Sequence, residues 1–231
     1  MTALLEIAVT SDLAAALAQA HGADRVELCT ALELGGVTPS QAAIEATVET
    51  GAQTHVLVRC RAGDFVYDDD EVRLMCREAA DVVRAGAAGV VIGALDAAGE
   101  LDLAAIERMA DAARSARSDV SVTVHRAIDA SADPVRSAAR AAASAVRATR
   151  ILTSGGRPSA GDAVDVITRM VAAAGAVQVM AGGGVTVDAI PRLTAAGVAA
   201  VHLSAKRRER DHWSLDPAIV AAARAALDAT R

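Results

Sequence analysis

The sequence predicts an α/β protein in which eight parallel strands close into a (β/α)8 barrel. Short apolar segments alternate with longer Ala-rich amphipathic segments along all 231 residues. They form eight strand–helix units of roughly 29 residues each, which is the spacing of a TIM barrel. No linker or change in composition interrupts the units, so we expect a single domain over residues 1–231. An open doubly wound sheet is the alternative, and the regularity of the units favours closure.

The predicted strands are short runs rich in Val, Ile and Leu, as expected where helices cover a parallel sheet. In chain order they cover residues 4–9, 25–29, 54–59, 89–93, 120–124, 150–153, 177–181 and 201–204. Predicted helices cover residues 11–21, 39–50, 69–85, 102–117, 134–146, 160–174, 186–196 and 216–229. Ser11, Asp133 and Asp216 are typical helix starts, and Gly22 and Gly86 stand where a helix ends in a left-handed residue.

The composition excludes several classes of protein. Aromatic residues make up 1% of the chain and the formal net charge is −6, which argues against nucleic-acid partners. No run of about 18 apolar residues is free of charge, so we expect no membrane span. The first residues lack the basic region of a signal peptide, and three cysteines give no disulfide framework. We therefore expect a cytoplasmic protein.

Strand residues of a barrel alternate between the helix layer and the interior. In the segment 120–125 the valines suit the helix layer, which leaves Ser121, Thr123 and His125 inside. The same alternation directs inward Glu6, Ala8, Glu27, Cys29, His55, Leu57, Arg59, Thr153, Gln178, Met180, His202 and Ser204. A purely structural barrel fills this space with branched apolar side chains. The polar set therefore predicts a site, and an internal ion-pair network that satisfies itself is the alternative.

Some of these residues suit acid–base chemistry. The candidate catalytic residues are Glu6, Glu27, Arg59, His125 and Asp129. Burial of the two glutamates and the charge of Arg59 would separate the pKa values of the carboxyl groups. His125 would act as a base, with Asp129 as its orienting carboxylate and Arg126 as an anion clamp.

A second group predicts anion binding after strands six to eight, where such barrels often hold phosphate. The glycine run at 182–184 precedes a predicted helix and offers backbone N–H groups. The candidate binding residues are Arg126, Thr153, Ser154, Gly182, Gly183, Gly184, His202 and Ser204. A glycine run also serves tight turns, which is the structural alternative.

Two cysteines are candidate metal ligands. Cys29 and Cys60 lie at the ends of adjacent predicted strands, and two thiolates would suit Cu(I). No CxxC or HxxxH spacing accompanies them, so two buried unbonded thiols are the alternative.

Several motifs resemble the CutC family almost from end to end. They are GADRVELC at 22–29, GGVTPS at 35–40, GDFVY at 63–67, GVVIG at 89–93, HRAID at 125–129, RILTSG at 150–155, MAGGGV at 180–185 and HLSA at 202–205. The resemblance implies a TIM-type barrel and a cytoplasmic homo-oligomer, for which we expect a dimer. It also implies a role in copper homeostasis through binding of a copper ion, Cu(I).

The chain departs from the copper pattern that this resemblance implies. That pattern places one cysteine at the end of strand one and another at the end of strand two. Here Cys29 is the second, but Ala8 takes the first position. The basic segment 206–212 also differs from the usual sequence after strand eight.

The sequence leaves two functions open, and a structural scaffold without chemistry is a third alternative, so the sequence does not decide whether the chain is an enzyme. The first is copper handling at Cys29, with Cys60 as the second ligand. The second is an enzyme that transfers or eliminates protons on a small anionic or sugar-like substrate, with Glu6, Glu27 and His125.

Overall fold

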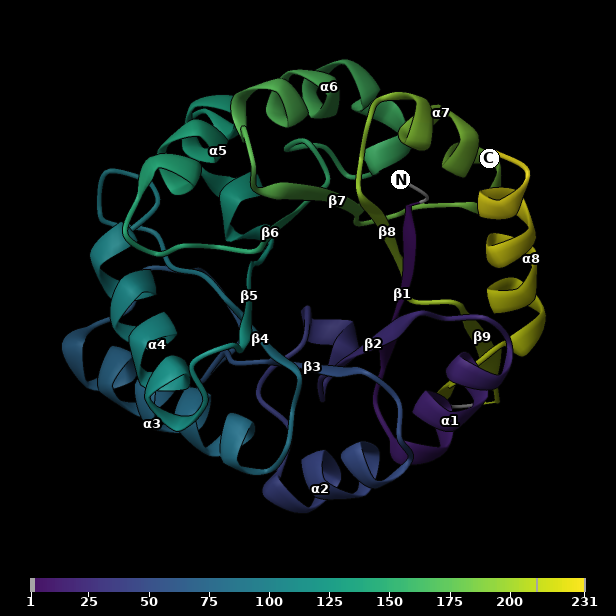
Figure 1. Cartoon of the computed structure of the whole chain (residues 1–231), viewed down its shortest axis with the longest axis horizontal. Helices are drawn as coiled ribbons and strands as arrows, with labels where there is room; N and C mark the ends of the chain where they lie inside the picture. Colours follow the sequence, from purple (N-terminus) through teal and green to yellow (C-terminus); the bar gives the residue numbers. More distant parts are fainter. Residues whose placement is uncertain (1–2, 211, 231) are drawn as a thin grey trace.

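Eight parallel strands close into a barrel in the computed structural model, which describes residues 3–210 and 212–230 (Figure 1). Consecutive strands pair in order, and β8 pairs with β1 to complete the ring. The strands are β1 Leu4–Val9, β2 Arg25–Leu28, β3 Thr54–Leu57, β4 Gly89–Ile92, β5 Ser121–Val124, β6 Arg150–Thr153, β7 Gln178–Gly182 and β8 Ala200–Leu203. The predicted (β/α)8 barrel is confirmed.

Helices surround the strands on the outer side (Figure 1). They are α1 Asp12–Ala20, α2 Gln41–Glu49, α3 Asp69–Arg84, α4 Leu103–Ala116, α5 Pro134–Ala143, α6 Val164–Ala173, α7 Ile190–Ala195 and α8 Pro217–Asp228. Ser and Asp side chains cap several of them; Asp68, for example, forms a capping box with Glu71 at the start of α3. Within the described residues, no helix has both the length and the apolar character needed to cross a membrane.

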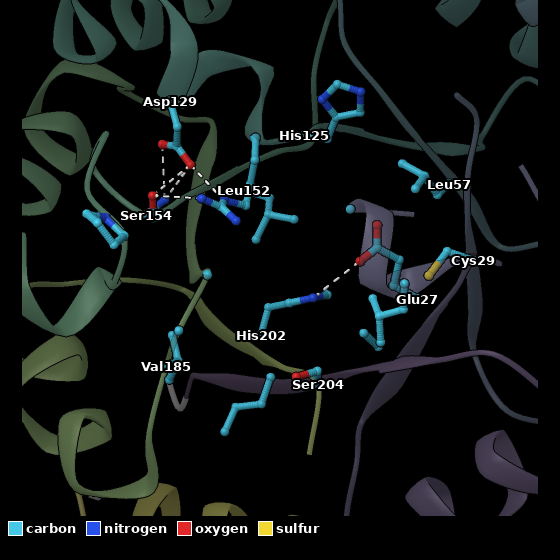
Figure 2. Close-up of a pocket in the computed structure, with 18 of the residues that line it drawn as sticks. Glu27, Cys29, Leu57, His125, Asp129, Leu152, Ser154, Val185, His202 and Ser204 are labelled. Atoms are coloured by element: carbon cyan, nitrogen blue, oxygen red, sulfur yellow. Dashed lines mark hydrogen bonds and ion pairs between the residues drawn. The ribbon is translucent and has the colours of Figure 1, made fainter. Parts of the chain in front are cut away.

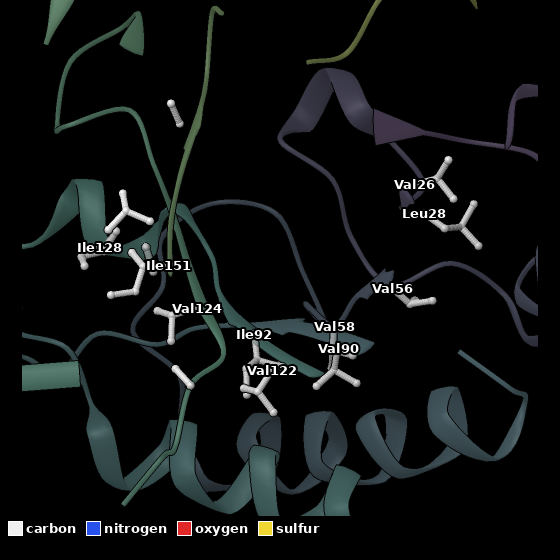
Figure 3. Close-up of a cluster of buried hydrophobic side chains, with 14 of the residues drawn as sticks. Val26, Leu28, Val56, Val58, Val90, Ile92, Val122, Val124, Ile128 and Ile151 are labelled. Atoms are coloured by element: carbon white, nitrogen blue, oxygen red, sulfur yellow. The ribbon is translucent and has the colours of Figure 1, made fainter. Parts of the chain in front are cut away.

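The core lies between the strands and the helices. One face of each strand contributes branched side chains to it, and Figure 3 shows those of Val26, Leu28, Val56, Val90 and Val122. Each is completely buried, which contributes about 1.5–3 kcal/mol per side chain. The opposite face of each strand is thereby free to carry polar groups into the barrel interior.

Two predicted helices are interrupted. The segment 160–174 begins with a 3-10 turn, η3 (Ala160–Asp162), and the segment 186–196 begins with η4 (Val187–Ala189). Neither α6 nor α7 has a side-chain cap, and α7 is only six residues long. Two further 3-10 turns, η1 (Leu32–Leu34) and η2 (Arg126–Ala130), follow β2 and β5 and border the barrel mouth.

The basic segment after β8 is a second departure from the prediction. It folds into an antiparallel hairpin of β9 (Lys206–Glu209) and β10 (His212–Leu215). Trp213 on β10 lies beneath two cations, with Lys206 Nζ at 4.8 Å and Arg208 Cζ at 5.7 Å from its ring centroid. The basic charges of residues 206–212 did not indicate that β9 and β10 would pair.

Candidate active site

A pocket of about 760 Å³ opens where the strands end (Figure 2). Polar and charged side chains line it together with apolar ones such as Leu57 and Leu152. The predicted site residues in the lining are Glu27, Cys29, Arg59, His125, Arg126, Asp129, Ser154, Gly183, Gly184, His202 and Ser204. The structure therefore brings most of the predicted site together in one place.

Four predicted site residues lie outside the lining: Glu6, Cys60, Thr153 and Gly182. The prediction that Thr153 points into the barrel was wrong by one residue. Leu152 takes the interior position, in a cluster with Met180 and Ala200. The Thr153 hydroxyl instead lies 3.5 Å from the sulfur of Met170 on α6, in the helix layer.

Beneath the pocket lies a chain of buried charged groups. His202 Nδ1 is 2.7 Å from Glu6 Oε1, and His202 Nε2 is 3.3 Å from Glu27 Oε2. Arg25 donates from Nε to the other carboxylate oxygen of Glu6, and from Nη2 to Met180 Sδ. Glu6 is thus held by cations from two sides, whereas Glu27 has His202 as its partner and reaches the pocket (Figure 2).

These surroundings shift the pKa values of the Glu6 and Glu27 carboxyl groups in opposite directions. Burial alone would raise the pKa of Glu6, but the hydrogen bond from His202 and the charge of Arg25 lower it to about 2. Burial raises the pKa of Glu27 to about 7, with Glu6 adding to the rise and His202 opposing it. Burial opposes the charged form of His202, but the Glu27 and Glu6 carboxylates raise its pKa. At neutral pH, Glu6 is ionised and Glu27 is poised to exchange a proton.

We expect the raised pKa of Glu27 to make the folded protein less stable as pH rises. An acid whose folded pKa exceeds its unfolded value of 4.5 binds its proton more tightly when folded, so its contribution is complete below pH 4.5 and is lost as pH rises through about 7. The loss is about 3 kcal/mol. Urea unfolding between about pH 5 and 7 should show this fall, and Glu27→Gln should flatten it. His202, whose pKa is raised by Glu27 and by Glu6, adds a fall at higher pH, and Glu27→Gln should reduce this second fall and leave the part that depends on Glu6. An unchanged slope in the variant would refute the assignment.

The arginine that acts on the carboxylates is Arg25, not the predicted Arg59. Arg59 is buried, but its guanidinium donates to the backbone oxygens of Gly36 and Gly63. It also stacks on Phe65, 4.8 Å from the ring centroid. Arg59 therefore holds the loops after β2 and β3 in place. Arg25 lies two residues before Glu27 on β2, so both side chains face the barrel interior. This spacing could have identified Arg25 as a site residue from the sequence.

His125 is 4% exposed and its ring packs 5.2 Å from that of Phe65. Burial lowers its pKa to about 3, and the charges of Arg59 and Arg126 act in the same direction. The imidazole is therefore neutral and a much weaker base than the Glu27 carboxylate. This argues for Glu27, rather than the predicted His125, as the base.

Asp129 organises the loop after β6. Its carboxylate accepts hydrogen bonds from the Thr153 hydroxyl at 2.5 Å, from the Ser154 hydroxyl and backbone N–H at 2.9 Å, and from the Gly156 N–H at 3.2 Å. Arg126 Nε donates to it at 2.9 Å. Both carboxylate oxygens of Asp129 are therefore engaged, and they position Arg126 and this loop. The prediction that Asp129 orients His125 was wrong.

The glycine loop after β7 forms one wall of the pocket. Among the described residues, the backbone N–H groups of Gly183, Gly184 and Val185 have no hydrogen-bond partner. The Arg126 guanidinium lies against Gly183, where a Cβ would be 2.8 Å from its Cζ. Lys206 lines the same pocket. Free N–H donors beside two cations suit an anion.

The residues present do not fit a two-thiolate copper site. Cys29 is buried, and burial with the nearby Glu27 and Glu33 raises the pKa of its thiol to about 12. It packs in the barrel interior, whereas Cys60 packs against the outer core. Among the described residues, Glu6, Glu27 and His202 form a group whose side-chain oxygen and nitrogen atoms lie within 4.8 Å of one another, and their contacts with Arg25 and with each other already engage this group. Its donors are carboxylate and imidazole, not the soft ligands that Cu(I) prefers.

The fold and the site define a TIM-barrel protein with a polar pocket above a buried carboxylate–imidazole network. The CutC family model matches residues 3–207, and the chain belongs to this family. A CutC family protein of Xylella fastidiosa strain Temecula1 is 43% identical over 209 residues, covering 89% of this chain and 76% of the relative. One from Xanthomonas axonopodis pv. citri is 45% identical over 184 residues, covering 79% and 74%. A crystal structure from Streptococcus agalactiae, named as a candidate copper homeostasis protein CutC, has a TM-score of 0.77 at 28% identity and covers 88% of this chain and 99% of that one.

Proposed function

We propose that this chain is an enzyme that moves a proton on a small anionic, sugar-like substrate, at a carbon next to a carbonyl group. The observation that carries the proposal is Glu27, a buried carboxyl group at the pocket surface with a pKa of about 7. A general base works best when its pKa lies near the operating pH. A purely structural ion pair would not need a carboxyl group that is half-protonated at neutral pH.

The pocket supplies a role for each group. Arg126, Lys206 and the free N–H groups of Gly183 and Gly184 would hold the anionic end of the substrate. The Glu27 carboxylate would take the proton from carbon, and His202 beside it would stabilise or share that proton. Glu6 lies too deep to meet substrate, and it would keep His202 oriented.

A deuterium-exchange screen tests the proposal. The protein is incubated in D2O with a panel of small phosphorylated and carboxylated aldehydes and ketones, and loss of the proton next to the carbonyl is followed by NMR. At least one compound should exchange faster with protein than without it. Exchange at the uncatalysed rate across the whole panel would contradict the proposal.

Binding of inorganic phosphate should depend on Gly183. This residue has a φ of +91° and lies against Arg126, so Gly183→Ala would strain the loop and displace the guanidinium. We expect isothermal titration to show phosphate binding weakened on the order of tenfold, which is about 1.4 kcal/mol. Gly51→Ala is the matched control, because Gly51 has a φ of +79° but no atom within 4 Å of its Cβ position. Equal effects of the two substitutions would show that backbone strain, not the anion site, is responsible.

A part in copper homeostasis is the second candidate function. The similarity to the Streptococcus agalactiae protein favours it, and so does the position of Cys29 at the pocket. If it is correct, the protein binds Cu(I) stoichiometrically under anaerobic conditions and Cys29→Ser abolishes this binding. Cys76→Ser on α3 is the control, and Cys60→Ser tests the second predicted ligand. Absence of binding in the wild type, or normal binding in Cys29→Ser, would exclude copper at this cysteine.

We also propose that the protein is a cytoplasmic homodimer. The family resemblance supports both the location and the dimer, and the three free cysteines, Cys29, Cys60 and Cys76, support the location alone. Sedimentation equilibrium would give twice the chain mass of 23.4 kDa. A monomer at micromolar concentration would contradict the dimer.

A further inference from the structure

We propose that His125 is a neutral hydrogen-bond donor that holds the carbonyl oxygen of the substrate and stabilises negative charge on it. This inference rests on the proposed function and assigns His125 a role different from the base predicted from sequence. It also narrows the substrate to an aldehyde or ketone that carries an anionic group.

The first step in the argument is that the backbone fixes which ring nitrogen carries the proton. Nδ1 of His125 lies 3.0 Å from the backbone N–H of Ala127, at the start of η2. A backbone N–H can only donate, so Nδ1 is the acceptor and carries no proton. The neutral ring must therefore carry its proton on Nε2.

The second step is that this Nε2–H has no partner. Among the described residues, Nε2 is a buried polar atom without a hydrogen bond. An unsatisfied buried donor costs about 1–3 kcal/mol and is rare without a functional reason. His125 lines the pocket, as Figure 2 shows, so a ligand oxygen there would be the missing acceptor.

The third step is that the ring cannot easily turn to find another partner. The His125 backbone N–H donates to Ile92 on β4 at 2.8 Å. The ring fills the space left by Gly93, where a Cβ would be 2.5 Å from Nδ1. Phe65 covers the ring from the loop after β3. A donor held this rigidly is suited to stabilising charge without reorganisation.

The groups that surround the ring keep it neutral. Burial and the cations Arg59 and Arg126 all disfavour the imidazolium, and Phe65 and Gly93 offer no charge. A neutral imidazole N–H can stabilise an enolate oxygen without giving up its proton.

The chemical step needs only the substrate, the Glu27 carboxylate and the His125 N–H. The Glu27 carboxylate removes a proton from the carbon next to the carbonyl, and the electrons of that C–H bond form a carbon–carbon double bond. The carbonyl π electrons move to oxygen, and the resulting enolate accepts the Nε2–H of His125. Return of the proton from Glu27 to the same carbon restores the carbonyl group and completes the exchange without an oxidant.

The first test is NMR of the 15N-histidine-labelled wild-type protein, with His125→Gln used to assign the signals. We expect the neutral Nε2–H form of His125 from about pH 5 to 8. We then add inorganic phosphate or 2-phosphoglycolate, which has a carboxylate where a substrate would have its carbonyl. Only 2-phosphoglycolate should shift the Nε2–H proton downfield. A proton on Nδ1, an imidazolium, or the same response to both ligands would overturn the proposal.

The second test compares two variants in the exchange reaction. His125→Ala should slow exchange by about 10²–10³-fold, the effect of losing one oxyanion donor. His125→Gln keeps an N–H and should recover part of this loss, with the rate still rising through the pKa of Glu27. If Gln is as slow as Ala and this pH dependence disappears, His125 is the base instead. If the screen finds no exchange, the proposed function fails, and the NMR measurements still decide the role of His125.

Discussion

Replacing Glu27 with Gln is expected to slow proton exchange on the substrate by about 10²–10⁴-fold, the usual contribution of a general base. Gln has nearly the same shape as Glu, so the contact with His202 can persist while the proton-accepting carboxylate is lost. In the wild type the rate should rise with pH through about 7, because the base is active only in its ionised form. The measurement is the initial rate of deuterium incorporation, followed by NMR over this pH range.

Glu33→Gln is the matched control for this substitution. Glu33 is an exposed residue of η1 that lines a second cavity of about 480 Å³, next to the main pocket, and it does not line the main pocket itself. This variant should retain the wild-type rate. An equal loss in both variants would point to an effect of net charge, and an unchanged rate in Glu27→Gln would remove Glu27 from the mechanism.

Replacing Glu6 with Gln is expected to lower the free energy of unfolding by about 3–5 kcal/mol, because Arg25 would remain buried without its counter-charge and His202 would lose one of its two carboxylate partners. Glu6 is 1% exposed, so solvent cannot screen this loss. Since the folded pKa of Glu6 is lowered to about 2, its contribution is complete above pH 4.5 and is lost as pH falls through 2. Glu6→Gln should therefore show a weaker acid-induced loss of stability than the wild type.

Urea unfolding at neutral pH measures the effect of Glu6→Gln, and two further variants interpret it. Asp81→Asn breaks the exposed ion pair with Arg84 and should cost less than about 1 kcal/mol. The double variant Glu6→Leu/Arg25→Met replaces the buried pair with apolar groups and should recover part of the loss. A cost below 1 kcal/mol for Glu6→Gln would mean that the buried network contributes little to stability.

The fold was predictable because its signals are local and repeated. Strand alternation placed Glu27, His125 and His202 in the interior, since the valines between them had to face the helices. The alternation failed at β6, where Leu152 and Thr153 are both compatible with a buried position and the sequence does not separate them. The hairpin of β9 and β10 was not predicted, because the basic segment 206–212 lacks the alternation of apolar and polar residues that indicates a strand.

The chemistry of the site was harder to predict than its position. Period-two spacing relates Arg25 to Glu27, but only the closed barrel shows that Arg25 bonds to Glu6 from the neighbouring strand. The role of Asp129 depends on a loop 24–27 residues further along the chain. The state of His125 depends on a single hydrogen bond from Ala127. Contacts of this kind depend on loop conformations, which no residue pattern specifies.

The hairpin provides the protein with an optical reporter. Trp213 is the single tryptophan of the chain, and its indole is partly exposed beside the ammonium group of Lys206. Lys206 also lines the main pocket, and the two cavities share it as a common wall. An anion that draws this ammonium away from the indole would change the fluorescence emission, so ligand titrations can be read from intrinsic fluorescence without a label.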